Sequence, residues 1–119
     1  MFLLLNHQAL DLYVTSRIFV KECYSLTRHL PTEERFGLSI QIRRAATSVH
    51  LNIAEGVSRK SSVERRRYYE IARGSVIEID AALDILNDLH YLKDLQLDPL
   101  RESMIRSFKM LSALIKISN

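Results

Sequence analysis

The chain has 119 residues, of which 47% are hydrophobic and 26% charged, and its net charge is +3. A chain of this size can bury one hydrophobic core, so we expect a single domain over residues 1–119. Three glycines and two prolines leave few places for turns, which favours a few long helices over many strands. The single Cys23 cannot form an intramolecular disulfide, which suits a reducing compartment. The apolar start, residues 1–5, is too short for a signal peptide or a membrane span, so we expect a cytoplasmic protein outside the membrane.

The first predicted helix covers about residues 8–29. Its core positions recur at alternating steps of three and four, the pattern of an amphipathic helix. They are Ala9, Leu12, Ser16, Phe19, Cys23, Leu26 and Leu30. Pro31 should end this helix, because the residue before a proline is pushed out of the α region.

The second predicted helix begins at Thr32, which can cap it, with acidic residues in the first turn. It carries two apolar stripes and therefore a wide apolar arc, which predicts contact on more than one side. The stripes are Phe36, Ile40, Thr47 and Ala54, and Leu38, Ile42, Ala45, Val49 and Ile53. Gly56 is expected to end the helix in the left-handed conformation.

The third predicted helix begins at a capping box formed by Ser61 and Glu64 and runs to about Leu92. Its core stripe is Tyr69, Ala72, Val76, Ile79, Leu83, Leu86 and Leu89. The fourth begins at Asp98-Pro99, an acid at the N-cap followed by proline at the first helical position. Its core stripe is Leu100, Met104, Phe108, Leu111 and Ile115. Short connections near residues 30–32, 56–61 and 93–98 predict an all-α, antiparallel up-down four-helix bundle.

Positive charge is concentrated between Arg43 and Arg73. Eight Arg or Lys and three Glu give this segment a net charge of +5, so the rest of the chain sums to −2. The candidate nucleic-acid-binding residues are Arg59, Lys60, Arg65, Arg66 and Arg67, at the turn and first helical turn that follow the second helix. Arginines pair with phosphates, and the N–H groups at a helix start also favour anions. Tyr68 and Tyr69 follow directly and could stack on bases or pack in the core. A solvated helix end without a ligand is the alternative.

A polar line follows the second helix. It consists of Gln41, Arg44, Ser48, Asn52 and Glu55. Polar groups inside a bundle cost about 1–3 kcal/mol each unless they are paired. We therefore expect a structural polar network of Arg44, Ser48, Asn52, Glu55 and Glu78, with Arg44 joined to Glu78 on the third helix.

Two further patterns could carry chemistry. Asp80, Asp84 and Asp88 stack at four-residue steps, but the di-iron motif of Glu and His on facing helices is absent, so we predict no metal and no cofactor. A solvated face, or pairing with arginines of another subunit, is expected instead. Arg44 and His50 have the spacing of a helical HEPN ribonuclease motif, which is short and common. A packed, hydrogen-bonded histidine is the favoured interpretation.

The motif QIRRAATSVHLNIAEG, followed by SRKSS and YYEIARGSVIEI, resembles the 23S rRNA intervening-sequence proteins, a bacterial family of four-helix bundles once labelled S23 ribosomal proteins. The similarity extends over LTRHLPTEERFGLSIQIRRA and so over nearly the whole chain. The family often has proline where this chain has His50, which speaks against catalysis by that residue. The chain is also similar to the accessory variability protein of diversity-generating retroelements.

The resemblance implies a homopentameric ring without enzymatic activity, with RNA or DNA, or a protein such as a reverse transcriptase, as the partner. Together with the basic turn, it favours a non-enzymatic nucleic-acid-binding or adaptor protein that contacts RNA or an RNA–protein assembly. Two alternatives stay open. One is a structural protein-interaction module that does not bind nucleic acid, and the other is a metal-independent ribonuclease that uses Arg44 and His50.

Overall fold

The computed structural model describes residues 2–118, except for the side chains of His7 and Ala9, and has four α-helices and no strand in that range. The elements in chain order are η1 (Asn6–Ala9), α1 (Asp11–Arg28), η2 (Thr32–Glu34), α2 (Leu38–Ser58), α3 (Ser62–Asp88) and α4 (Asp98–Ile117). The predicted all-α four-helix bundle is confirmed, and Ala9, assigned to its core, lies outside the described side chains.

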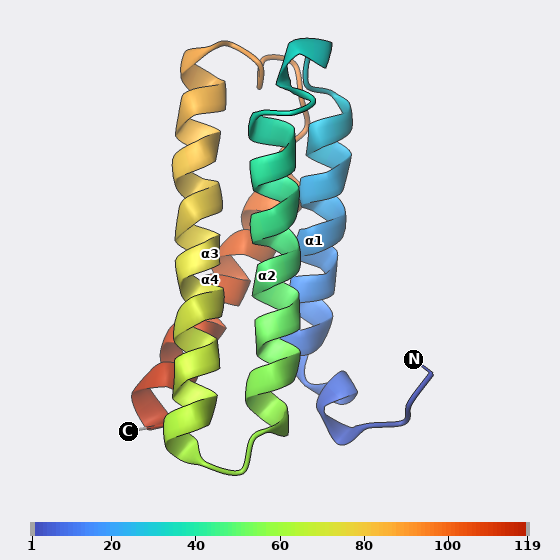
Figure 1. Cartoon of the computed structure of the whole chain (residues 1–119). Helices are drawn as coiled ribbons and strands as arrows, with labels where there is room; N and C mark the ends of the chain where they lie inside the picture. Colours follow the sequence, from blue (N-terminus) through green and yellow to red (C-terminus); the bar gives the residue numbers. More distant parts are fainter. Residues whose placement is uncertain (1, 119) are drawn as a thin grey trace.

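The four helices run alternately up and down (Figure 1). α1 contacts α2 and α4, and α3 contacts the same two helices, so the helices follow one another around the bundle. η1, the C-terminal end of α4 and the α2–α3 turn lie towards one end of the molecule, and the other two connections lie at the opposite end (Figure 1). No helix within residues 2–118 combines the length and apolar content needed to cross a bilayer.

The core follows the stripes expected from the sequence. Its largest fully buried apolar side chains are Phe19, Cys23, Ile42, Val49, Ile53, Ile79, Leu86 and Leu111. Each large side chain of this kind contributes about 1.5–3 kcal/mol through burial. The two stripes of α2 differ. The stripe with Ile42 is buried against the other helices, whereas Phe36 in the other stripe is 81% exposed, before α2 begins.

The start of the second helix was predicted too early. Thr32 opens only the short η2, and α2 begins at Leu38 after Gly37, a poor helix former. Glu34 supplies the acceptor that Thr32 was expected to provide. Its Oε1 atom accepts a hydrogen bond from the backbone N–H of Leu38 at 3.2 Å, which satisfies one unpaired donor of the first turn.

Gly56 does not end α2, contrary to the prediction. It is a buried residue inside the last turn, and no glycine of the chain has a positive φ. A Cβ atom at this position would lie 2.6 Å from Cε1 of Tyr69 and 3.2 Å from Cβ of Tyr68. The glycine is therefore needed for the close approach of α2 and α3. Gly74 on α3 is exposed by contrast, with nothing within 4 Å of the position that a Cβ atom would take.

α3 ends four residues earlier than predicted, at Asp88. The backbone N–H of Tyr91 bonds to the carbonyl of Leu86, and that of His90 bonds to Asn87, which is the Schellman pattern. His90 takes the left-handed conformation, with a φ of 64°, where glycine is usual. Leu89, assigned to the core, is consequently 46% exposed.

The start of α4 is shifted by one position. Leu97 is the N-cap and Asp98 the first helical residue, whose carboxylate pairs with Arg101 instead of capping a backbone N–H. Pro99 lies in the first turn as expected.

Candidate nucleic-acid interface

The basic turn joins α2 to α3 through residues 59–61. Ser61 is the N-cap of α3, and its hydroxyl accepts a hydrogen bond from the backbone N–H of Glu64 at 3.3 Å, as the capping box predicted. Nη1 of Arg65 donates to the backbone carbonyls of Arg59 at 3.0 Å and Lys60 at 2.6 Å. Arg65 therefore holds the turn in place, and much of its hydrogen-bonding capacity is used within the chain.

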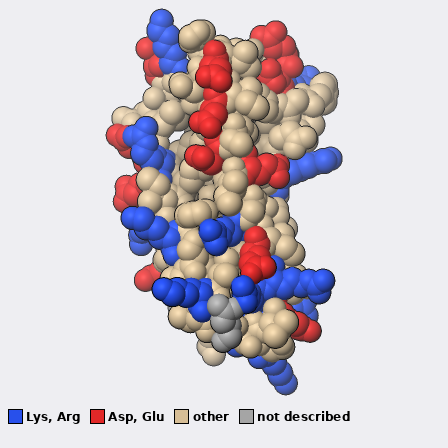
Figure 2. Space-filling view, turned by 90° about the vertical axis from the view of Figure 1, so that its left-hand side faces the viewer, with Lys and Arg blue, Asp and Glu red and all other residues tan. Residues whose placement is uncertain are grey.

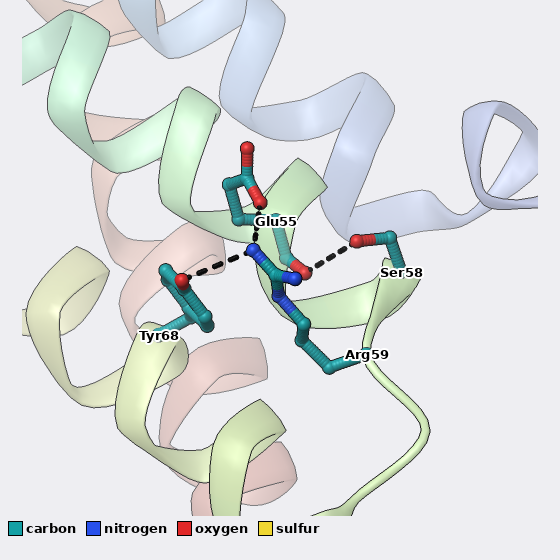
Figure 3. Close-up of polar contacts among 4 residues, drawn as sticks. All are labelled: Glu55, Ser58, Arg59 and Tyr68. Atoms are coloured by element: carbon teal, nitrogen blue, oxygen red, sulfur yellow. Dashed lines mark hydrogen bonds and ion pairs between the residues drawn. The ribbon is translucent and has the colours of Figure 1, made fainter.

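Arg59 is also held by neighbours (Figure 3). Its Nη2 atom lies 2.7 Å from Oε2 of Glu55 and 3.1 Å from the hydroxyl oxygen of Tyr68. The guanidinium carbon lies 5.0 Å from the centre of the Tyr68 ring, within the range of a cation–π contact. Arg59 thus links the end of α2 to the start of α3.

The remaining three cations face solvent to different degrees. Arg66 pairs with Glu70 one turn further on, with Nε and Oε1 2.9 Å apart, and both side chains are about half exposed. Exposed pairs of this kind contribute only about 0.3–0.5 kcal/mol, so a phosphate can displace the carboxylate. Lys60 and Arg67 are exposed, and within the described part of the chain their side chains have no hydrogen bond or ion pair.

The two tyrosines have separate roles. Tyr69 is 4% exposed and packs against Gly56, so it belongs to the core, and burial raises the pKa of its phenol. Tyr68 is half-buried, and its ring and hydroxyl contact Arg59. Base stacking by Tyr69 is therefore excluded by its position.

The structure adds cations that the sequence did not bring together with the turn. Because α4 runs antiparallel to α3, its C-terminal half, with Lys109 and Lys116, lies towards the N-terminal half of α3, and Arg106 lies near the middle of α4. Figure 2 shows Lys and Arg gathered over this lower half of the α3–α4 face and acidic residues over the upper half. Only knowledge of which helices are neighbours could have revealed this, because these α4 residues lie 39 to 57 positions after those of the basic turn.

The acidic upper half contains the aspartate ladder. Asp80, Asp84 and Asp88 are all exposed on α3, which agrees with the expected solvated face. Within residues 2–118, no three His, Cys, Asp or Glu side chains gather in a way that could hold a metal ion.

The polar line of α2 is only partly internal. The hydroxyl of Ser75 on α3 donates to that of Ser48 at 2.9 Å, and the Asn52 amide donates to the backbone carbonyl of Ser48 at 2.8 Å. Arg44 and Glu78 are exposed, and no ion pair joins them in the described chain. The expected Arg44–Glu78 link is therefore wrong within one chain. Glu55 is likewise exposed and pairs with Arg59.

His50 is packed in the contact between α1 and α2. Its Nδ1 atom lies 2.7 Å from the hydroxyl oxygen of Ser16, and its ring centre lies 4.5 Å from that of Tyr13. The Ser16 hydroxyl also donates to the Tyr13 carbonyl, so both contacts are satisfied when Nδ1–H of His50 donates. Arg44 is exposed, and among the described residues no hydrogen bond joins it to His50, which agrees with the favoured interpretation of a packed histidine.

Comparison with known proteins places these features in a family. No curated protein matches the chain. The family model described as "23S rRNA-intervening sequence protein" matches residues 8–113, which includes all four helices except the last few residues of α4. The chain therefore belongs to the 23S rRNA-intervening sequence protein family.

Proposed function

We propose that this protein is a non-enzymatic nucleic-acid-binding or adaptor protein, which contacts RNA or an RNA–protein assembly through the basic α2–α3 turn. The observation that carries the proposal is the exposure of Lys60 and Arg67 beside Arg66, on a turn that Arg65 and Arg59 hold in one conformation. The rRNA context in the family description supports an RNA partner.

The contact would be electrostatic. Lys60 and Arg67 are available to phosphates directly, and Arg66 becomes available when its exposed pair with Glu70 opens. Arg106 and Lys109 on α4 extend the positive surface beyond the turn. Phosphate contacts of this kind depend on salt and carry no base specificity, so the turn should bind many sequences.

Charge reversal of the two exposed cations tests this proposal. Replacing Lys60 and Arg67 with Glu should lower RNA affinity at least tenfold at 0.1 M salt and flatten the dependence of affinity on salt. Replacing Arg65 is less informative, since it also removes hydrogen bonds to the turn. The control reverses Lys93, in the α3–α4 connection, and Arg101, in the first turn of α4. Both are exposed, and this connection lies at the other end of the bundle (Figure 1). Equal affinities of wild type and the turn variant across a salt series would reject the turn as the contact.

The resemblance implies a ring of five identical subunits. Such a ring would present the basic turn five times and so raise the avidity for nucleic acid. The oppositely charged halves of the α3–α4 face support association with further copies, because rings join two different patches. Between them lies a groove of about 290 Å³ lined by Ile77, Met104, Ile105 and Phe108. A protein partner such as a reverse transcriptase is proposed from the resemblance alone.

The same α3–α4 face favours the second candidate, a structural module that binds only protein. Its apolar groove, with Ile77 and Ile105 about half exposed, is suited to a protein surface. One measurement distinguishes the nucleic-acid-binding protein from the protein-only module. A protein-only module would show no salt-dependent affinity for RNA or DNA. The ribonuclease alternative requires RNA cleavage that disappears in His50→Ala, and the packing of His50 gives it no support.

A further inference from the structure

A second basic surface lies along the seam between α1 and α2, away from the turn. It is a groove of about 450 Å³, and we call it the α1–α2 groove. Its lining residues are Arg17, Val20, Lys21, Tyr24, Arg28, Thr47, His50 and Leu51. Three of the eight are cations, none is an acid, and most of the remaining surface is apolar or aromatic.

The cations of the groove form one stripe on α1. At 3.6 residues per turn, Arg17, Lys21 and Arg28 fall within about 40° of one another around the helix axis. Asp11 and Glu22, the acidic residues of α1, lie about 80–140° away from them by the same geometry. Glu22 faces a different hollow, lined also by Leu97 and Leu100. The opposite charges of α1 therefore lie on different faces, and the positive stripe lies on the exposed edge of α1 that borders α2.

These cations are not used within the chain. Arg17, Lys21 and Arg28 are exposed, and none has an ion pair or side-chain hydrogen bond in the part of the chain that the structure describes. A fourth cation, Arg43, reinforces the Arg28 end. Its guanidinium carbon lies 4.9 Å from the centre of the Tyr24 ring, and its Nε donates to the Thr27 hydroxyl at 2.8 Å.

Apolar surface lies between the charges. Leu51 is 61% exposed although it faces the groove, and Tyr24 is half-buried with its ring held by Arg43. An exposed leucine and an ordered aromatic ring beside a row of cations suit a ligand with both phosphates and flat apolar faces. Only unpaired bases present such faces, because those of a duplex are stacked inside.

We propose that the α1–α2 groove binds single-stranded nucleic acid, with phosphates along Arg17, Lys21 and Arg28 and bases against Tyr24 and Leu51. Arg17 and Arg28 are separated by about 16 Å along the helix, so the groove holds a short stretch of strand. Its Leu51 end points to the same end of the bundle as the basic turn, since α2 leads from Leu51 to that turn. The inference deepens the proposed function and rests on nucleic-acid binding by this chain.

The test compares binding of a labelled oligo-uridine strand and of a matched RNA duplex by fluorescence anisotropy across a salt series. Arg17→Glu with Lys21→Glu should weaken binding of the single strand at least tenfold at 0.1 M salt and duplex binding by much less. The control is Lys93→Glu with Arg101→Glu, which changes the net charge equally and should alter affinity less than twofold. Unchanged thermal unfolding checks that each variant folds.

An uncharged variant separates base contact from electrostatics. Leu51→Ser should weaken single-strand binding several-fold without changing the salt slope, because it removes apolar contact and no charge. Ile85→Ser is the matched control, because this isoleucine is about half exposed on α3 and lines neither groove, so it should have no effect on strand binding.

The outcomes distinguish the groove from the turn. Loss of affinity in the turn variant Lys60→Glu/Arg67→Glu, with wild-type affinity in the groove variant, would overturn this inference and leave the proposed function standing. Equal losses for strand and duplex in the groove variant, or no effect of Leu51→Ser, would reject single-strand recognition. Absence of any binding by the wild type would reject both proposals.

Discussion

At the scale of single residues, the two helical glycines differ in their surroundings: Gly56 lies at a close helix–helix contact and Gly74 does not. Both lie inside helices, where glycine costs about 0.5–1 kcal/mol relative to alanine. Gly56 is enclosed by Tyr68 and Tyr69, whereas the space around Gly74 is open. Whether a methyl group at each position stabilises the fold therefore depends on the neighbouring helix.

We predict that Gly56→Ala destabilises the protein by about 1–3 kcal/mol, because the new methyl group overlaps the buried Tyr69 ring. Gly74→Ala, the matched control, should stabilise it by about 0.5–1 kcal/mol through helix propensity. Urea unfolding followed by circular dichroism measures both changes. A stabilised Gly56→Ala variant would show that α2 and α3 do not need this close approach.

Cys23 gives a second prediction at this scale. Burial, with a smaller contribution from Glu22, raises the pKa of its thiol from 9.0 to about 12. The unfolded chain therefore loses the proton first, so this contribution to stability is complete below pH 9 and declines as pH rises towards 12. The decline approaches about 1.4 kcal/mol per pH unit. In Cys23→Ala, stability should be lower at neutral pH but should fall less between pH 9 and 12. Parallel curves for the two proteins would contradict this assignment.

At the scale of elements, the ends of the helices are fixed by side chains and backbone conformations that local sequence signals did not identify. Glu34 caps α2 in place of Thr32, and Arg65 secures the α2–α3 turn through two carbonyls. His90 ends α3 in a left-handed conformation that costs a residue with a Cβ about 1–2 kcal/mol. The boundaries therefore differ from expectation where an unusual residue takes the capping role.

His90→Gly should stabilise the protein by about 0.5–1 kcal/mol, since glycine adopts the left-handed conformation without the steric cost. Because the side chain of His90 is exposed, removing it should cost little packing energy. Asp94, with a φ of 67° in the same connection, allows a parallel test through Asp94→Gly. Thermal unfolding measures both, and a lower midpoint for His90→Gly would mean that the side chain contributes more than the backbone strain costs.

At the scale of the whole molecule, the antiparallel arrangement places like charges from different helices together. The N-terminal half of α3 and the C-terminal half of α4 form a basic region, and the C-terminal half of α3, with Glu78, Asp80, Asp84 and Asp88, forms an acidic one (Figure 2). The net charge of +3 does not reveal this separation, because the positive charge of one region nearly cancels the negative charge of the other. A neighbouring molecule would meet strong fields of both signs on one face.

If the proposed ring forms, light scattering should give five times the chain mass of 13.8 kDa. Ile105→Asp should disrupt assembly because it places a charge at the apolar α3–α4 groove. Ile18→Asp is the matched control, since both isoleucines are 45% exposed and Ile18 lies on α1. The mass of a single chain for the wild type at micromolar concentration would rule the ring out.

The sequence by itself determined the number and type of helices, most of the core and the location of the basic turn. Apolar spacing around an α-helix depends only on its period, and the Ser61 cap is likewise a local interaction. Tertiary structure decided which charges are available. Arg65 is held by carbonyls of the turn, Arg44 faces solvent instead of Glu78, and Lys109 lines a groove with Ile77 of α3, 32 residues earlier in the sequence. These outcomes depend on distances between helices, which the period of a single helix does not encode.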